Sequence, residues 1–201
     1  MTIFLILAPY GAFACLMLVM SSTASLLTAA GVSLATIAID AVRGRSLKIL
    51  PVSSAIVFVG MATYLNLIDP NVSDKAVKLS VDVGVFAVSL GSMLVRYPFT
   101  TQYALESVPA EIAAMPGFAR ANYIITAVWT TSMLLMMLVN AAILYVPGLP
   151  IWLGLAVAFA ARNSAVFFTK WYSAQRRARD LRAAGQRIAE GAITFNPEEC
   201  R

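Results

Sequence analysis

Six long apolar segments, separated by short polar connections, dominate the hydrophobic pattern of the chain. Each segment is about 18–24 residues long, the length that an α-helix needs to cross about 30 Å of hydrocarbon. The segments are continuous, whereas strands of a membrane β-barrel alternate apolar and polar residues. The pattern therefore predicts an all-α, polytopic transmembrane bundle with helices at about 3–20, 24–42, 47–68, 76–95, 123–146 and 150–172.

The composition supports a membrane protein and offers little for catalysis. Hydrophobic residues make up 60% of the 201 residues and charged residues 12%, whereas a soluble chain would carry about a quarter charged residues. Histidine is absent, and the two cysteines, Cys15 and Cys200, have no metal-site or disulfide spacing. We therefore predict no metal, no cofactor, no catalytic residues and no nucleic-acid partner.

Positive charge gathers on one side of the predicted topology. The connection at 43–48, the connection at 96–122 and the chain after residue 170 hold most of the Lys and Arg residues, while the opposite side has Lys75 and Lys78. Cytoplasmic loops of membrane proteins carry an excess of Lys and Arg. We therefore predict a multi-pass protein of the bacterial inner membrane with both termini cytoplasmic. The start lacks a basic region and a cleavage site, so we expect a retained first helix.

Residues 173–201 differ in character from the six segments. Small and apolar residues recur at steps of three and four, and basic residues occupy the other faces, which predicts a basic amphipathic helix that continues from the sixth segment. One interpretation is an anchor on anionic headgroups of the bilayer. The other is a coiled-coil contact with a membrane-protein partner or a second copy of the chain. The candidate surface residues are Arg176, Arg177, Arg179, Arg182 and Arg187.

Asp82 and Arg162 form a candidate intramembrane polar pair. Each is an ionisable residue in a predicted span, and such residues usually face the bundle interior and find a partner. One interpretation is a structural lock between two helices. The other is a proton or ion pathway, or an anion site at Arg162.

The connection between the fourth and fifth segments is the longest. Pro98 is expected to end the fourth helix, and Pro109 followed by Glu111 predicts the start of a short interfacial helix. Pro116-Gly117 is expected to break that helix before the fifth span. Arg96 and Arg120 flank Glu106 and Glu111, which predicts local ion pairs.

This connection also carries a resemblance. The run Arg96-Tyr97-Pro98-Phe99-Thr100-Thr101-Gln102-Tyr103-Ala104, followed by Ile125-Thr126-Ala127-Val128-Trp129, resembles uncharacterised bacterial integral membrane proteins that share a Pro-Phe-Thr-x-x-Tyr-Ala signature. More distantly, Arg43-Gly44-Arg45 and the apolar segment after it resemble the intracellular septation protein A group, which implies an envelope or division role. The candidate motif residues are Arg96, Pro98, Phe99, Thr100, Gln102, Tyr103, Glu106 and Arg120.

Two functional hypotheses follow from these observations. The first is a non-enzymatic accessory or scaffold component of the bacterial cell envelope. The alternative is a small channel or transporter for an ion or small solute that uses Asp82 and Arg162. A membrane enzyme is disfavoured, because the sequence has no histidine, cysteine pair, carboxylate cluster or glycine-rich phosphate loop.

Overall fold

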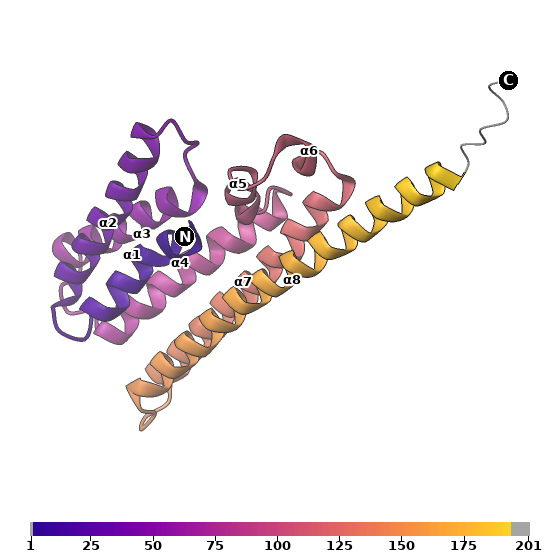
Figure 1. The fold of residues 1–201 in the computed structure, drawn as a ribbon. Coiled ribbons are helices and arrows are strands. Elements are labelled where there is room, and N and C mark those ends of the chain that lie inside the picture. The colour runs from indigo at the N-terminus through magenta and orange to yellow at the C-terminus, as the bar shows by residue number, and fades with distance from the viewer. Residues whose placement is uncertain (1, 194–201) are drawn as a thin grey trace, which may run out of the picture. The chain divides into compact units, whose positions relative to one another are not determined.

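A computed structural model describes residues 2–193 of the chain, with side chains described for residues 9–115, 117–150, 152–179, 182 and 183. The described residues form eight helices and no strand (Figure 1), as the all-α prediction requires. They are α1 (Thr2–Leu16), α2 (Ser22–Val42), α3 (Ile49–Leu67), α4 (Asp74–Leu94), α5 (Phe99–Leu105), α6 (Ala110–Ala113), α7 (Pro116–Tyr145) and α8 (Ile151–Ile193). The chain divides into two compact units between Ala165 and Val166, within α8.

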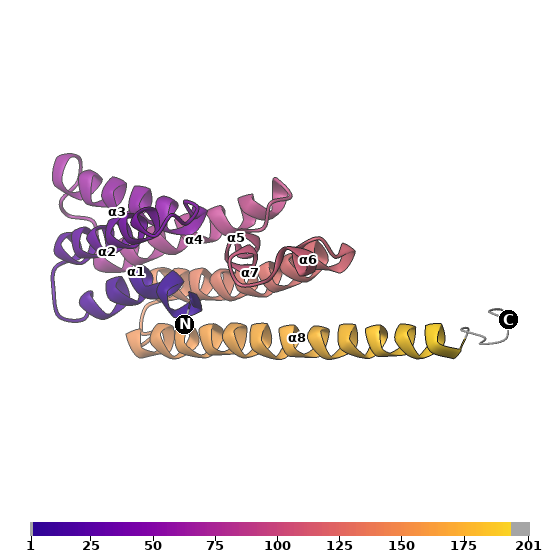
Figure 2. The same ribbon diagram turned by 45° about the horizontal axis from the view of Figure 1, so that its top comes forward.

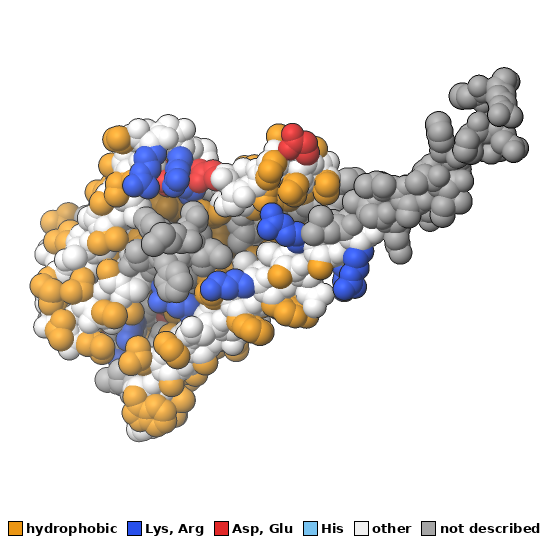
Figure 3. All heavy atoms as spheres, viewed as in Figure 1, with side chains coloured by type: hydrophobic (Ala, Val, Ile, Leu, Met, Phe, Trp, Pro, Cys, Tyr) orange, Lys and Arg blue, Asp and Glu red, His pale blue; other side chains and the backbone are white. Residues whose placement is uncertain are grey.

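Five of these helices are long and apolar enough to cross a membrane. The candidate spans are Ser22–Val42, Ile49–Leu67, Asp74–Leu94, Gly117–Tyr145 and Trp152–Arg179. Large hydrophobic side chains such as Ile56, Leu67 and Phe159 are exposed on them, and Figure 3 shows hydrophobic side chains spread over the visible face of α2 and α3. Exposed apolar surface on this scale needs lipid. The chain is therefore a polytopic membrane protein.

The first predicted span is shorter than expected. Helix α1 has 15 residues, about 22 Å at 1.5 Å per residue, and it ends at Leu16 rather than Met20. The N–H groups of Leu18 and Val19 donate to carbonyls three residues earlier, at Cys15 and Leu16. These bonds tighten the chain into a turn, and the Ser21 side chain then caps α2 by accepting from the N–H of Ala24.

Contacts at the helix ends fix the directions of α2, α3, α4 and α7, which lie side by side in both ribbon views (Figures 1 and 2). The Ser22 hydroxyl donates to Asp74, so the N-terminal ends of α2 and α4 meet. Lys75 donates to the carbonyl of Ile143, which brings the start of α4 to the end of α7. Neighbouring helices along the chain therefore run in alternating directions, as in a multi-pass bundle.

Small residues let the helices approach closely. Ser25, Ala29 and Ser33 are buried along α2, and a Cβ at Gly84 of α4 would lie 2.9 Å from a methyl group of Val57. The hydroxyls of Ser89 and Thr130 lie 2.7 Å apart and join α4 to α7. This small-residue packing is typical of membrane helices, which gain little hydrophobic energy from association in lipid.

The connection between α4 and α7 holds two short helices rather than the one expected. Helix α5 follows Pro98 directly, and α6 follows Pro109. The chain breaks at Pro116-Gly117 as predicted. Helix α7, however, begins there and not at Tyr123, the predicted start of the fifth span. The reason is that proline is favoured in the first turn of a helix, where its missing N–H would have no partner.

Helix α8 runs from Ile151 to Ile193 and so extends past the sixth predicted segment; the basic amphipathic surface of this extension stays a prediction. Within residues 166–201, Phe168 packs on the rings of Trp171 and Tyr172. The side chains of Arg177, Arg179 and Arg182 are exposed and that of Arg176 is half-buried. The side chain of Arg187, the residue Cys200 and the tail after residue 193 lie outside the described residues.

Candidate functional site

The motif loop begins where α4 ends. The N–H of Tyr97 donates to the carbonyl of Ser92, and that of Arg96 donates to Met93, both at 3.0 Å. This is the Schellman arrangement, in which the residue at Arg96's position is usually glycine. Arg96 has a φ of 58°, which costs an L-residue about 1–2 kcal/mol. The favourable interaction of a cation with the helix C-terminus recovers about 0.3–1 kcal/mol of that cost.

The next residues fasten α5 to the helices on either side. The backbone of Pro98 is extended and leads directly into α5. Phe99 is 2% exposed, and its N–H donates to the Ser92 hydroxyl at 3.2 Å. The Thr100 hydroxyl donates to the carbonyl of Asn122 at 3.1 Å and lies 2.6 Å from that of Thr126. The start of the motif therefore joins α4 to α7.

Gln102 joins the same loop to α3. Its side-chain carbonyl oxygen accepts a hydrogen bond from the backbone N–H of Ile49 at 2.8 Å. The first N–H groups of a helix have no partner within the helix, and Lys48 at the N-cap position makes no side-chain cap. Gln102 thus caps α3 from a distant part of the sequence.

Three charged residues, Lys48, Asp40 and Glu106, lie close together next to α5. The ammonium group of Lys48 lies 2.8 Å from the Asp40 carboxylate and 3.0 Å from that of Glu106, and the Lys48 side chain is 3% exposed. A buried cation is tolerated when carboxylates pair with it. Arg45 extends the group outward at 3.8 Å from Asp40. Helices α2, α3 and α5 therefore meet around one buried lysine.

Tyr103 completes this group, which we call the Lys48 cluster (Asp40, Lys48, Tyr103 and Glu106). The Lys48 ammonium lies 5.3 Å from the centre of the Tyr103 ring, within range of a cation–π interaction. Tyr103 is 8% exposed, and its hydroxyl is the buried side-chain polar atom without a hydrogen-bond partner among the described residues. Burial raises the pKa of Tyr103 above its ordinary value, and the charges of Asp40, Tyr10 and Glu106 raise it further.

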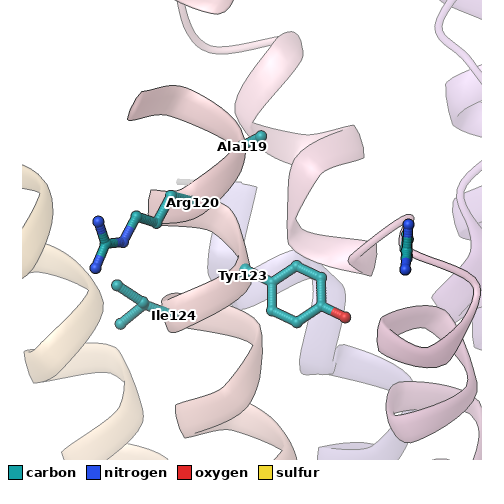
Figure 4. Close-up of a pocket in the computed structure, with 5 residues that line it drawn as sticks. Ala119, Arg120, Tyr123 and Ile124 are labelled. Carbon is teal, nitrogen blue, oxygen red and sulfur yellow. The ribbon is translucent and has the colours of Figure 1, made fainter. Parts of the chain in front are cut away.

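Glu106 pairs with Lys48, 58 positions away, and not with Arg96 or Arg120 as the sequence suggested. Those two arginines instead line a surface hollow next to α7 (Figure 4). Sequence reasoning missed Asp40 and Lys48 as site residues. The available signal was a carboxylate in the last turn of an apolar segment, followed eight residues later by a lysine.

Asp82 and Arg162, the candidate intramembrane residues, each contact another helix. Asn140 of α7 donates its amide N–H to the Asp82 carboxylate of α4. The guanidinium of Arg162 lies against α1, because a Cβ added at Gly11 would meet its two nitrogens at 3.5 and 3.6 Å. The pairing of Asp82 with Arg162 stays a prediction. Asp82 contributes to the contact between α4 and α7.

The described residues contain no group of three or more His, Cys, Asp or Glu side chains that could hold a metal ion. What the Lys48 cluster can do chemically is hold α5 against α2 and α3 through charges shielded from water. Comparisons with protein-family models, with curated proteins and with solved structures found no match for this chain.

Proposed function

We propose that this chain is a non-enzymatic integral protein of the bacterial inner membrane that acts as an accessory or scaffold component of the cell envelope. The proposal takes residues 2–20, which include α1, as a first crossing and the five longer helices as the others. Both termini then lie in the cytoplasm, and the Lys48 cluster and the motif loop lie at the cytoplasmic ends of the helices. The two family resemblances belong to this proposal.

The observation that carries the proposal is that four residues of the motif contact neighbouring helices of the same protein. Phe99, Thr100, Gln102 and Glu106 contact Ser92, Asn122, Ile49 and Lys48, which belong to or border α4, α7 and α3. Side chains that act on a substrate must face a cavity or solvent, whereas these side chains fix a surface loop in one position. A rigid loop on the cytoplasmic face supports a docking role.

The alternative function, a small channel or transporter, depends on Asp82 and Arg162. The Asp82 carboxylate is hydrogen-bonded to Asn140 across the interface between α4 and α7. Interhelical hydrogen bonds of this kind are common structural contacts in membrane bundles. This setting supports a structural role for Asp82 over transport.

A reconstitution experiment separates the two functions. The full-length protein is placed in liposomes that hold a pH-sensitive dye, and a pH gradient or a potassium gradient is applied. We expect the same leak as in protein-free liposomes, for the wild type and for Asp82→Asn. A flux that the wild type supports and Asp82→Asn abolishes would contradict the scaffold proposal and establish transport.

Crosslinking in living cells tests the scaffold directly. A photoreactive amino acid replaces Arg179, which is exposed on α8, and in a matched control replaces Ile56, which is exposed on a candidate span. We expect a protein adduct of one defined mass from position 179 and only lipid adducts from position 56. If position 179 and exposed positions of the motif loop, such as Tyr97, give no protein adduct, the scaffold proposal fails.

A further inference from the structure

The first half of α8, residues 151–165, has a buried face and an exposed face. Gly154 and Ala161 are buried. A Cβ added at Gly154 would lie 2.9 Å from the Ile143 side chain of α7, and the Ser132 hydroxyl of α7 donates to the carbonyl of Ala161 at 3.2 Å. These contacts pack the buried face of α8 on α7.

The exposed face carries four residues in the spacing of a seam between two helices. Trp152 and Phe159 are 67% and 72% exposed, and Ala156 and Asn163 are exposed as well. The four follow one another at steps of four, three and four residues, which places them in one row along the helix. Asn163 comes nine residues after Gly154, which is two and a half turns, so this row lies opposite the buried face.

Asn163 lies near the middle of the membrane. It follows Trp152, at the start of the candidate span, by 11 residues and precedes the exposed Lys170 by seven. At 1.5 Å per residue it is about 16 Å from Trp152, about half of a 30 Å hydrocarbon layer. Lipid covers apolar side chains as well as a protein does, but a polar group in hydrocarbon is costly unless it forms hydrogen bonds.

The hydrogen bonding of Asn163 within the chain is incomplete. Among the described residues its side chain makes one hydrogen bond, in which the amide N–H donates to the carbonyl of Phe159 at 2.7 Å. An asparagine amide has two N–H donors and a carbonyl oxygen, so one N–H and the oxygen remain for a partner. Two other asparagines in the spans differ. Asn140 donates to Asp82 within the bundle, and Asn66 lies one residue before the end of α3, close to water.

We propose that the partner of Asn163 is a second copy of this chain, packed along Trp152, Ala156, Phe159 and Asn163 of α8. Two copies inserted in the same orientation are related by a two-fold axis along the membrane normal, so their α8 helices run parallel and each seam residue meets its counterpart. The amide both donates and accepts, so the two Asn163 side chains satisfy each other. A different membrane protein would need a matching amide at the same depth, whereas a second copy supplies it by symmetry.

The residues around Asn163 leave room for this contact. Ala156 in the same row has a small side chain, and small residues let membrane helices approach closely. The charged neighbour, Arg162, is directed away from the seam, because its guanidinium lies against α1 at Gly11. The two Arg162 charges therefore do not face each other across the axis. The proposal needs the chain to lie in a membrane but does not depend on the scaffold function.

Energy transfer between copies in liposomes tests the dimer. Full-length protein with Cys15→Ser is labelled at Cys200 with a donor or an acceptor dye, mixed, and diluted with lipid. We expect energy transfer that falls as lipid is added. Asn163→Leu should weaken the dimer about tenfold, since two reciprocal hydrogen bonds are lost, and Asn163→Gln, which keeps an amide, should recover most of the affinity. Ser164→Leu, a change at an exposed residue beside the seam, is the matched control and should leave the affinity unchanged.

Disulfide formation locates the contact face. With Cys15 and Cys200 replaced, Ala156→Cys should form a disulfide between two copies when isolated membranes are mildly oxidised, and Ser164→Cys should not. Both variants keep Asn163, so they decide the case even if Asn163→Leu folds poorly.

Three results would overturn the proposal. The first is no energy transfer in the wild type at the highest ratio of protein to lipid. The second is an affinity that Asn163→Leu leaves unchanged or that Ser164→Leu reduces as strongly. The third is a disulfide of Ala156→Cys with a protein other than this chain, which would show that the face binds a different membrane protein.

Discussion

At the end of the bundle where α2 meets α3, one lysine is buried and contacts other helices, whereas at the end where α3 meets α4 the charged side chains are exposed or half-buried. Lys48 is 3% exposed and contacts two carboxylates from other helices. At the opposite end, the hydrogen bond between Ser22 and Asp74 is exposed to solvent, and Asp69 bonds to its neighbour Asn71 two residues away. The first end is held by buried charge contacts between helices. The second has an exposed interhelical hydrogen bond, a local one and the bond from Lys75 to the carbonyl of Ile143.

This difference explains why the motif loop is at the first end. A loop that serves as a docking surface needs a fixed conformation, and the loop has too few residues to form a core of its own. Contacts from Gln102, Tyr103 and Glu106 to α2 and α3 supply the missing support. The opposite end has to turn the chain, and short connections with capping serines at Ser21 and Ser73 do this.

The first prediction concerns the side of the membrane on which each end of the bundle lies, and its outcome is reaction or no reaction. With Cys15 and Cys200 replaced, a single cysteine at Ser46 or Ser107 should resist a membrane-impermeant thiol reagent in intact cells, because positive loops stay inside. A cysteine at Ser73 should react. After the membrane is permeabilised, all three positions should react, which controls for local burial. Reaction at Ser46 and protection at Ser73 would reverse the proposed topology.

The largest energetic effect is expected from Lys48→Met. Removing the lysine leaves two carboxylates close together beneath α5, and breaking a buried ion pair costs about 3–5 kcal/mol. We expect the free energy of unfolding, measured by SDS titration in mixed micelles, to fall by that amount. Lys75→Met, a change at an exposed lysine on the opposite side, should cost at most about 1 kcal/mol because exposed charges contribute little.

A double variant sharpens the same point. Lys48→Met combined with Glu106→Gln should lose less stability than the sum of the single losses, because the second change removes one of the stranded charges. Additive losses would show that Lys48 and Glu106 do not interact in the membrane. Losses of equal size at Lys48 and Lys75 would remove the contrast between the two ends.

Much of the fold followed from the sequence because it depends on local composition. The five candidate spans lie within a few residues of the predicted segments, apart from the early start of α7 at Pro116 and the end of the last candidate span at Arg179 rather than at residue 172. The continuous α8 was likewise visible in the spacing of its apolar and basic residues. Length and apolarity decide these features, and neither requires knowledge of distant contacts.

The site was largely hidden from the sequence because its contacts join distant residues. Gln102 and Ile49 are 53 positions apart, so Gln102 gave no sign of being a helix cap. Lys48 counted only as a positive charge in a loop, and Asp40 was absorbed into an apolar segment. Helix α5 contains two adjacent threonines, which have low helix propensity, and it forms because Phe99 and Tyr103 are buried.

The middle of the bundle should respond less strongly than the Lys48 cluster. Asn140→Ala removes the amide that donates to Asp82, and a hydrogen bond to a charged group contributes about 1.5–3 kcal/mol. We expect a loss of that size in SDS titration, and a smaller loss when Asp82 is already changed to Asn. Thr131→Ala, also in α7 but bonded only within its own helix, is the control.

A second set of single and double variants, measured by the same SDS titration, tests the predicted pairing of Asp82 with Arg162. If the two residues form a lock, Asp82→Asn and Arg162→Gln should each destabilise the protein, and the double variant should lose less than the sum. Additive losses would exclude the lock and leave Asn140 as the partner that stabilises Asp82.

The smallest effect is expected from Tyr103→Phe, because the substitution removes a buried hydroxyl that has no hydrogen-bond partner among the described residues and keeps the ring. Near neutral pH the free energy of unfolding should stay within about 1 kcal/mol of the wild type or rise, since leaving a buried polar group unsatisfied is itself costly.

The pH dependence of the free energy of unfolding should change more clearly. The folded-state pKa of Tyr103 lies above its unfolded value, so its contribution to stability is complete below about pH 10 and is lost as the pH rises further. Wild-type stability should therefore fall faster than that of Tyr103→Phe above pH 10, with Tyr97→Phe, an exposed tyrosine in the same loop, as the control. Parallel curves for wild type and Tyr103→Phe would mean that the Tyr103 hydroxyl reaches water, and that the Lys48 end is more open than its contacts indicate.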